Sequence, residues 1–163
     1  MNKIIIIGCP GSGKSTFAKE LKKLIDLPIY HLDLIWNKPD KTTLTREEFD
    51  KILKDIFQEE KWIMDGNYQR TLEIRIKEAD TIFFLDYDLE TCLNGATTRV
   101  GTVRDDMPWK EEKLNDEFKD KIIKFSEKQK PEIDNLLNKY KNEKEIIIFK
   151  TREDAKDYLN NLK

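Results

Sequence analysis

Residues 4–15 read IIIIGCPGSGKS, an apolar run that leads directly into a glycine-rich turn. Residues 8–15 fit the phosphate-binding pattern of a glycine, any four residues, and then Gly-Lys-Ser. Glycines in such a turn let successive backbone N–H groups point toward a phosphate, and the helix that follows directs its positive end at the same place. The stretch therefore predicts a buried strand, a phosphate-binding loop and a helix, in that order.

The polar side chains of this loop have expected partners in a bound nucleoside triphosphate. Lys14 is expected to reach the β- and γ-phosphates of ATP and to act in catalysis, and Ser15 is expected to bind Mg²⁺ through its hydroxyl. We assign further contacts with ATP to Gly8, Pro10, Gly11, Ser12, Gly13 and Thr16. A glycine-rich turn without a ligand is the alternative. ATP and Mg²⁺ are thus the predicted cofactors.

Length and composition limit the kind of protein this is. A chain of 163 residues is long enough for one domain with a substantial core. Its net charge of −2 gives no overall attraction to nucleic acid or to an anionic membrane. Cys9 and Cys92 lack the spacing of metal ligands and suit a reducing compartment. No secretory leader and no membrane-spanning run is visible, so we expect a cytoplasmic protein with no membrane partner.

Short apolar runs alternate with amphipathic segments along the chain. Runs of near-continuous hydrophobicity are typical of strands that are buried on both faces. The expected strands are 3–7, 27–31, 62–64, 81–85 and 145–149, and the expected helices are 14–25, 46–59, 70–77, 89–99, a long pattern over 111–140, and a last segment over 151–162. Pro131 lacks a backbone N–H and is expected to divide the long pattern into two helices. Such alternation predicts a parallel sheet with right-handed crossovers.

An aspartate follows each of three expected strands. Asp33 follows the second strand, Asp65 the third and Asp86 the fourth. The carboxyl ends of parallel strands form the ligand crevice in open sheets. We predict that Asp65 orients Mg²⁺ through water, with Asp86 as its rival, and that Asp33 holds or deprotonates the phosphate acceptor. Each aspartate can instead cap a turn or a helix.

Residues 99–109, RVGTVRDDMPW, combine arginines with a glycine and a proline between two helical patterns. This composition predicts a flap that closes over the bound nucleotide. An arginine at the transferred phosphoryl group can raise the rate by roughly 10³- to 10⁵-fold. Arg104 is the first candidate and Arg99 the second, both for catalysis and for ATP binding. Asp105 and Asp106 are expected to orient the flap rather than bind metal, and an ordinary surface loop is the alternative.

Aromatic and polar residues near Asp65 are candidates for binding the acceptor. Gly66 and Tyr68 lie in the turn after the third strand, and Trp36 follows the second strand. The rings of Tyr68 and Trp36 can stack on a base or another ring, although such residues are often part of the core.

Arginines follow the same turn, on the next helical pattern. Guanidinium matches phosphate with two parallel hydrogen bonds, so Arg70, the nearer to the crevice, is predicted to bind an anionic group of the acceptor, with Arg75 as a second candidate. His31 is the only histidine and is predicted to pack or to support the site, with a general-base role as the alternative.

These motifs together resemble the nucleoside monophosphate kinase group of P-loop proteins. Within it, the chain is most similar to the adenylate-kinase-related proteins of the DNA topology modulation group. The resemblance runs from residue 1 to about residue 109 and rests on segments 8–15, 30–33, 62–68, 70–72 and 79–86. It implies transfer of the γ-phosphate of ATP to a nucleoside monophosphate or a nucleoside.

The chain departs from adenylate kinases at two places. In adenylate kinases the counterpart of residues 65–66 continues as Phe-Pro-Arg, and that arginine holds the phosphate of the monophosphate, whereas here Arg70 comes one residue later. Adenylate kinases also have a further arginine after an Arg-Asp-Asp like that of residues 104–106, where this chain has Lys110 and Lys113. Both departures concern the acceptor rather than ATP.

We therefore predict one α/β domain over residues 1–163, with a three-layer P-loop NTPase fold. Its five parallel strands should have the order 2-3-1-4-5 with helices on both faces, an acceptor-binding segment at about 33–60 and a lid at about 99–113. The predicted function is Mg²⁺-dependent phosphorylation of a small-molecule acceptor. The alternatives are a nucleotide-dependent regulatory protein with little turnover, and a kinase of a non-nucleotide hydroxy acid, as in shikimate and gluconate kinases.

Overall fold

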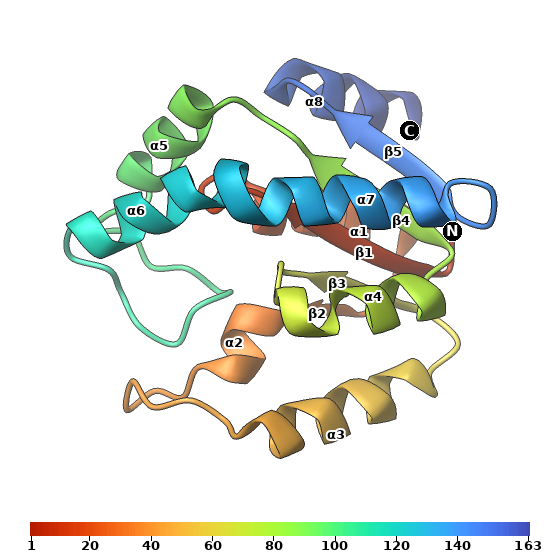
Figure 1. Cartoon of the computed structure of the whole chain (residues 1–163), viewed down its shortest axis with the longest axis horizontal. Coiled ribbons are helices and arrows are strands. Elements are labelled where there is room, and N and C mark those ends of the chain that lie inside the picture. The colour runs from red at the N-terminus through yellow and green to blue at the C-terminus, as the bar shows by residue number, and fades with distance from the viewer.

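Strand β1 (Lys3–Gly8) is the central strand of a sheet in which all neighbouring strands are parallel. The computed structural model describes residues 1–163. The other strands are β2 (Ile29–His31), β3 (Trp62–Asp65), β4 (Thr81–Leu85) and β5 (Glu145–Phe149), and the order across the sheet is β2-β3-β1-β4-β5 (Figure 1). This is the predicted order, and it brings the carboxyl ends of β3, β1 and β4 to one edge.

Helices cover both faces of the sheet, which confirms the three-layer prediction. Helices α1 (Lys14–Ile25) and α8 (Arg152–Asn161) lie on one face, and α4 (Gln69–Glu78) and α7 (Lys130–Tyr140) lie on the other (Figure 1). The remaining helices are α2 (Leu32–Trp36), α3 (Arg46–Phe57), α5 (Leu89–Thr98) and α6 (Asp116–Lys124). The four isoleucines of β1 are completely buried between the two layers, as expected for a strand covered on both sides. None of the helices combines the length and the apolar composition that crossing a membrane requires.

The region after the second strand differs from the prediction. β2 begins at Ile29 rather than at residue 27, and the chain turns into the short helix α2 immediately after His31. Asp33 therefore lies after the strand, as predicted, and in the first turn of a helix. An acidic side chain at this position suits the positive end of a helix.

The long pattern contains two α-helices, as predicted, and Pro131 lies in the first turn of the second one, α7. The chain is helical without interruption from Asp116 to Tyr140, and a π-helical turn over Phe125–Gln129 joins α6 to α7. Pro131 has no N–H to donate, and the turn before it is widened, with the Lys130 N–H donating to the Phe125 carbonyl. The first helix begins five residues later than predicted, at Asp116 rather than at residue 111, because the Asn115 side chain caps it there.

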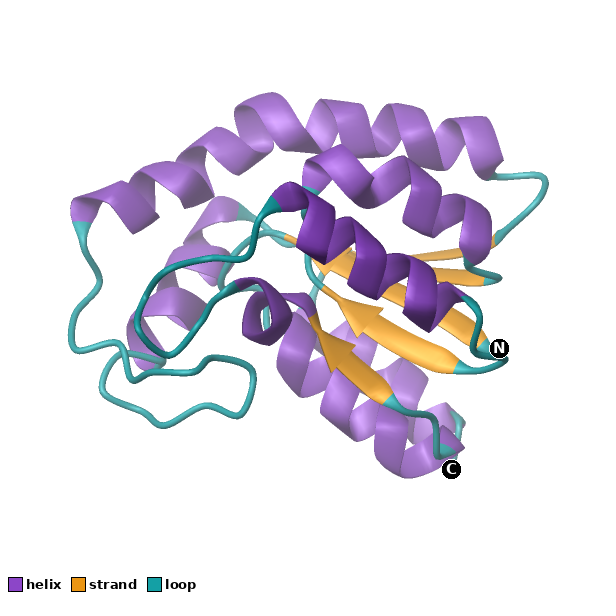
Figure 2. Ribbon diagram, turned by 90° about the horizontal axis from the view of Figure 1, so that it is seen from below, coloured by secondary structure: helices purple, strands orange, loops and turns teal.

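The segment between α5 and α6, residues 99–115, contains no helix or strand and forms a long loop beside the carboxyl ends of the strands (Figure 2). It contains the predicted lid. This long loop lies at the same edge of the sheet as the loop after β1, so the two segments can share a ligand.

Candidate active site

The loop between β1 and α1 has the backbone conformation that a phosphate cradle requires. Gly11 and Gly13 have φ angles of 86° and 93°, in the left-handed region that side chains disfavour. Gly11 also lies so close to α5 that an added Cβ would be 2.1 Å from the Cys92 carbonyl oxygen. Both glycines are therefore fixed by backbone geometry, and α5 supports the loop from behind.

The donor set around this loop fits ATP. Lys14 Nζ donates to the carbonyls of Gly8 and Cys9, at 3.0 and 3.2 Å, and burial lowers the pKa of Lys14. Arg99 has a buried Nε with no partner in the protein, and such a donor is costly to leave unpaired. Together with the N-terminus of α1, these groups suit a polyanionic ligand.

A cavity of about 560 Å³ opens beside the loop, a volume typical of small-molecule sites. Most of the predicted site residues line it: Pro10, Gly11, Gly13, Lys14, Ser15, Asp33, Trp36, Asp65, Gly66, Tyr68, Arg99 and Arg104. The predicted residues that do not line it are Gly8, Ser12, Thr16 and Arg70, and the alternative candidates His31, Arg75 and Asp86 do not line it either. The structure thus brings the lid, the loop and two strand ends to one cavity.

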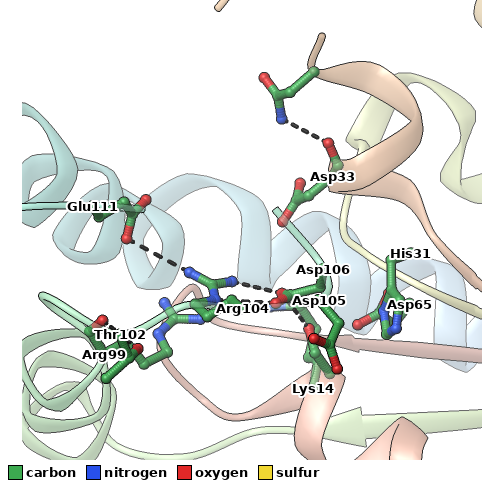
Figure 3. A network of polar contacts seen from close by, with 12 residues as sticks. Lys14, His31, Asp33, Asp65, Arg99, Thr102, Arg104, Asp105, Asp106 and Glu111 are labelled. Carbon is green, nitrogen blue, oxygen red and sulfur yellow. Dashed lines mark hydrogen bonds and ion pairs between the residues drawn. The ribbon is translucent and has the colours of Figure 1, made fainter. Parts of the chain in front are cut away.

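Asp106 occupies a place that the sequence did not predict. Its Oδ2 accepts a hydrogen bond from Ser15 Oγ at 2.7 Å, whereas the sequence interpretation gave Asp106 only a role in orienting the flap. Arg104 donates to both carboxylate oxygens, at 3.0 and 2.5 Å, and its Nη1 lies 3.5 Å from Glu111 (Figure 3). Burial raises the pKa of Asp106, but hydrogen bonds from Arg104 and Ser15 outweigh it and hold the pKa well below its usual range.

Of the two aspartates considered for Mg²⁺, only Asp65 lies in the cavity. It is buried, and its Oδ1 lies 2.8 Å from His31 Nδ1 (Figure 3). Burial lowers the pKa of His31, but the hydrogen bond to Asp65 and the negative charges of Asp65 and Asp106 together outweigh it, so the net pKa is raised. Asp86 is instead paired with Lys130 and Lys150 outside the cavity. Asp65 therefore stays the candidate, with His31 as the residue that supports it.

The acceptor side of the cavity consists of a carboxylate and aromatic rings. Tyr68 donates its hydroxyl to Asp33 Oδ1 at 2.7 Å. The ring of Tyr68 lies 6.1 Å from that of Trp36 and 5.2 Å from that of Phe49, between centroids. Burial and the neighbouring Asp33 raise the pKa of Tyr68, so its hydroxyl stays a donor at neutral pH.

The two arginines proposed for the acceptor do not line the cavity. Arg70 forms a two-pronged ion pair with Asp50 on α3, with hydrogen bonds of 3.0 and 2.6 Å. Arg75 is completely buried and donates to the carbonyls of the three residues of the turn 66–68. Arg75 thus holds the turn in shape, and the acceptor wall contains neither arginine.

Replacing Arg70 with alanine is expected to leave nucleotide affinity and the acceptor KM unchanged. The pair with Asp50 is exposed at the surface, so its loss should lower the free energy of unfolding by less than about 1 kcal/mol. Calorimetric titration measures the nucleotide affinity, steady-state kinetics measure the acceptor KM, and urea denaturation measures the free energy of unfolding. Asp50→Ala, the matched control, should behave identically. A rise in acceptor KM in Arg70→Ala that Asp50→Ala lacks would return Arg70 to the acceptor site.

Asn67 lines the cavity, and sequence reasoning did not select it as a site residue. Its Nδ2 donates to the Gly8 carbonyl at 2.7 Å, and its Oδ1 accepts from the Gly8 N–H at 3.0 Å. The amide therefore joins the turn after β3 to the start of the phosphate loop. Its place in the Asp-Gly-Asn turn is a signal, but the contact spans 59 residues and no local pattern predicts it.

No protein-family model matches this chain. Among curated proteins, a 76-residue stretch is 41% identical to a shikimate kinase from Clostridium botulinum (strain Loch Maree / Type A3), and it covers 47% of this chain. The match spans only 37% of the length of that relative.

The fold is similar to those of solved small-molecule kinases. A shikimate kinase from Acinetobacter baumannii in complex with shikimate has a TM-score of 0.60 at 13% identity, over 99% of this chain and 90% of that one. A gluconokinase from Sinorhizobium meliloti 1021 has a TM-score of 0.58 at 12% identity, over 99% of this chain and 89% of that one. None of these three relatives carries the DNA topology modulation description, so that narrower grouping stays a prediction. The comparisons show the P-loop kinase fold of the shikimate and gluconate kinases.

Proposed function

We propose that this protein is an ATP- and Mg²⁺-dependent kinase that phosphorylates a hydroxyl group of a small molecule. The observation that carries the proposal is the composition of the cavity. Its lining includes Lys14 and Ser15 of the phosphate loop, two lid arginines and the Asp33 carboxylate. The matched stretch of a shikimate kinase supports the same reaction class.

Each group has a part in such a transfer. Bound ATP supplies the phosphoryl group, and Mg²⁺ neutralises part of its charge. Lys14, Arg99 and Arg104 stabilise the charge on the phosphates. Asp33 orients the acceptor hydroxyl and takes up its proton, while the Tyr68 hydroxyl holds the carboxylate in place.

Within this class, we propose a nucleoside as the acceptor rather than a nucleoside monophosphate. Trp36 and Tyr68 offer rings against which a base can stack. Arg70 and Arg75, the two residues suggested for the phosphate of a monophosphate, are engaged elsewhere, whereas a nucleoside needs neither of them.

A hydroxy acid is the second candidate acceptor. A hollow of about 460 Å³ shares Trp109, Glu111 and Phe118 with the main cavity. Its lining includes lysines 41, 110 and 113, which can bind a carboxylate. The fold shared with shikimate and gluconate kinases points the same way.

A phosphate-transfer screen read by phosphorus NMR tests the proposal. The panel pairs nucleosides with their 5′-monophosphates and includes shikimate and gluconate. We expect a new phosphoester signal with at least one nucleoside and none from Asp33→Asn, which should still bind ATP. A product formed only from a hydroxy acid would shift the assignment to the second candidate. If no acceptor alters ATP consumption, the kinase proposal fails and a regulatory nucleotide-binding protein replaces it.

A further inference from the structure

The lid touches the phosphate loop through one carboxylate. Asp106 lies 91 residues after Ser15 in the sequence, yet its Oδ2 is 2.7 Å from the Ser15 hydroxyl oxygen. Asp106 is only 3% exposed, and its side chain is directed toward the loop rather than toward solvent (Figure 3). The contact therefore belongs to the interior of the site.

A buried carboxylate at this position is unfavourable for binding ATP alone. Ser15 is the loop residue expected to face the metal and phosphates, so the charge of Asp106 would lie close to them. Arg104 compensates part of this charge, but it also forms an ion pair with Glu111. A divalent cation between Asp106 and the phosphates would convert this repulsion into attraction.

We propose that Asp106 is a direct ligand of the Mg²⁺ that accompanies ATP, so that the metal joins the lid to the phosphate loop. The inference rests on the ATP binding of the proposed function, but not on the identity of the acceptor. Two ligands at right angles on Mg²⁺, each about 2.1 Å away, have oxygen atoms about 3.0 Å apart. Ser15 Oγ and Asp106 Oδ2 are already 2.7 Å apart, so the ion can replace the shared hydrogen with little movement.

The neighbouring groups agree with this assignment. One carboxylate oxygen of Asp65 is hydrogen-bonded to His31. This arrangement suits a contact between Asp65 and the metal through water rather than a direct bond. Arg104 donates to the same carboxylate, so metal binding at Asp106 would also fix Arg104 beside the phosphates. Few protein ligands are needed, because Mg²⁺ usually keeps several waters and takes one or two carboxylates plus phosphates.

Manganese binding measured by electron paramagnetic resonance, with the β,γ-imido analogue of ATP, tests the proposal. In Asp106→Asn, the affinity of the protein–analogue complex for Mn²⁺ should fall at least about tenfold. Its affinity for the analogue in EDTA should not fall. The matched control is Asp105→Asn, one residue away. The Asp105 side chain is 82% exposed and pairs with Lys19, so this variant should match the wild type in both measurements.

Several outcomes would overturn the proposal. Unchanged Mn²⁺ affinity in Asp106→Asn excludes a direct bond, and increased affinity means that Asp106 competes with the metal for Ser15. An equal loss of metal-free analogue affinity assigns Asp106 only to positioning Arg104. If wild type fails to bind the analogue at all, the proposed function fails instead.

A measurement on the wild-type protein covers the case in which Asp106→Asn does not fold. With the analogue bound, adding Mg²⁺ should slow amide hydrogen exchange across residues 100–113. If the metal adds no protection to this segment, the proposed link between lid and loop is wrong.

Discussion

Replacing Arg104 with alanine is expected to lower kcat by about 10³- to 10⁵-fold, the effect of removing an arginine from a transferred phosphoryl group. The side chain of Arg104 is only 14% exposed and lies in the cavity, held by Asp106 and Glu111. It is therefore already fixed near the phosphate loop before a ligand binds. Arg104→Lys keeps the charge but loses the two parallel hydrogen bonds to Asp106, so it should recover only part of the rate.

The effect on turnover has to be separated from an effect on folding. Arg104→Ala leaves the buried Asp106 carboxylate with Ser15 as its remaining hydrogen-bond donor side chain, which should lower the free energy of unfolding by on the order of 3 kcal/mol. Arg104→Ala combined with Asp106→Asn removes that charge and should restore stability without restoring turnover. Steady-state kinetics with the acceptor from the screen, together with urea denaturation, measure both. Turnover of Arg104→Ala within tenfold of wild type would remove Arg104 from the reaction.

Lys14→Ala is expected to lower kcat by about 10²- to 10³-fold and to weaken nucleotide binding. The ammonium group of Lys14 contacts only two carbonyls of its own loop in this structure, so it is available to phosphates. Its removal should change stability little, because burial already disfavours the charge. Calorimetric titration with the imido analogue measures the binding.

Lys19 supplies the control for Lys14. It lies on the same helix, α1, but its ammonium group pairs with the exposed Asp105. Lys19→Ala should therefore bind the analogue like the wild type. If Lys14→Ala also keeps wild-type affinity, the phosphate loop does not hold the nucleotide and the proposed function loses its basis.

The sheet and the phosphate loop could be predicted because their signals are local. Strands β1, β3, β4 and β5 each contain an uninterrupted apolar run, and Gly11 and Gly13 stand where the backbone demands a glycine. The capping box that starts α8, with Thr151 and Asp154 in reciprocal hydrogen bonds, likewise lies within four residues. Such features depend on neighbours in the chain, which the sequence shows directly.

The rest of the site depends on contacts between distant segments. The sequence shows that Arg70 follows the turn after the third strand. It does not show that Asp50, on another helix, forms an ion pair with Arg70. The sequence likewise shows that Asp106 lies near Arg104 in the lid. It does not show that the Ser15 hydroxyl donates a hydrogen bond to Asp106. The sequence indicates that a helix starts at Pro131, but not that a π-helical turn joins this helix to the preceding one.

The amide of Asn67 has a mechanical consequence. Its two hydrogen bonds to Gly8 fasten the turn that carries the acceptor wall to the start of the phosphate loop. The donor and acceptor halves of the cavity are thus joined by a direct contact that does not involve the lid. The distance between a bound phosphate donor and a bound acceptor should then be set by this contact, before either ligand binds and whatever the position of the lid.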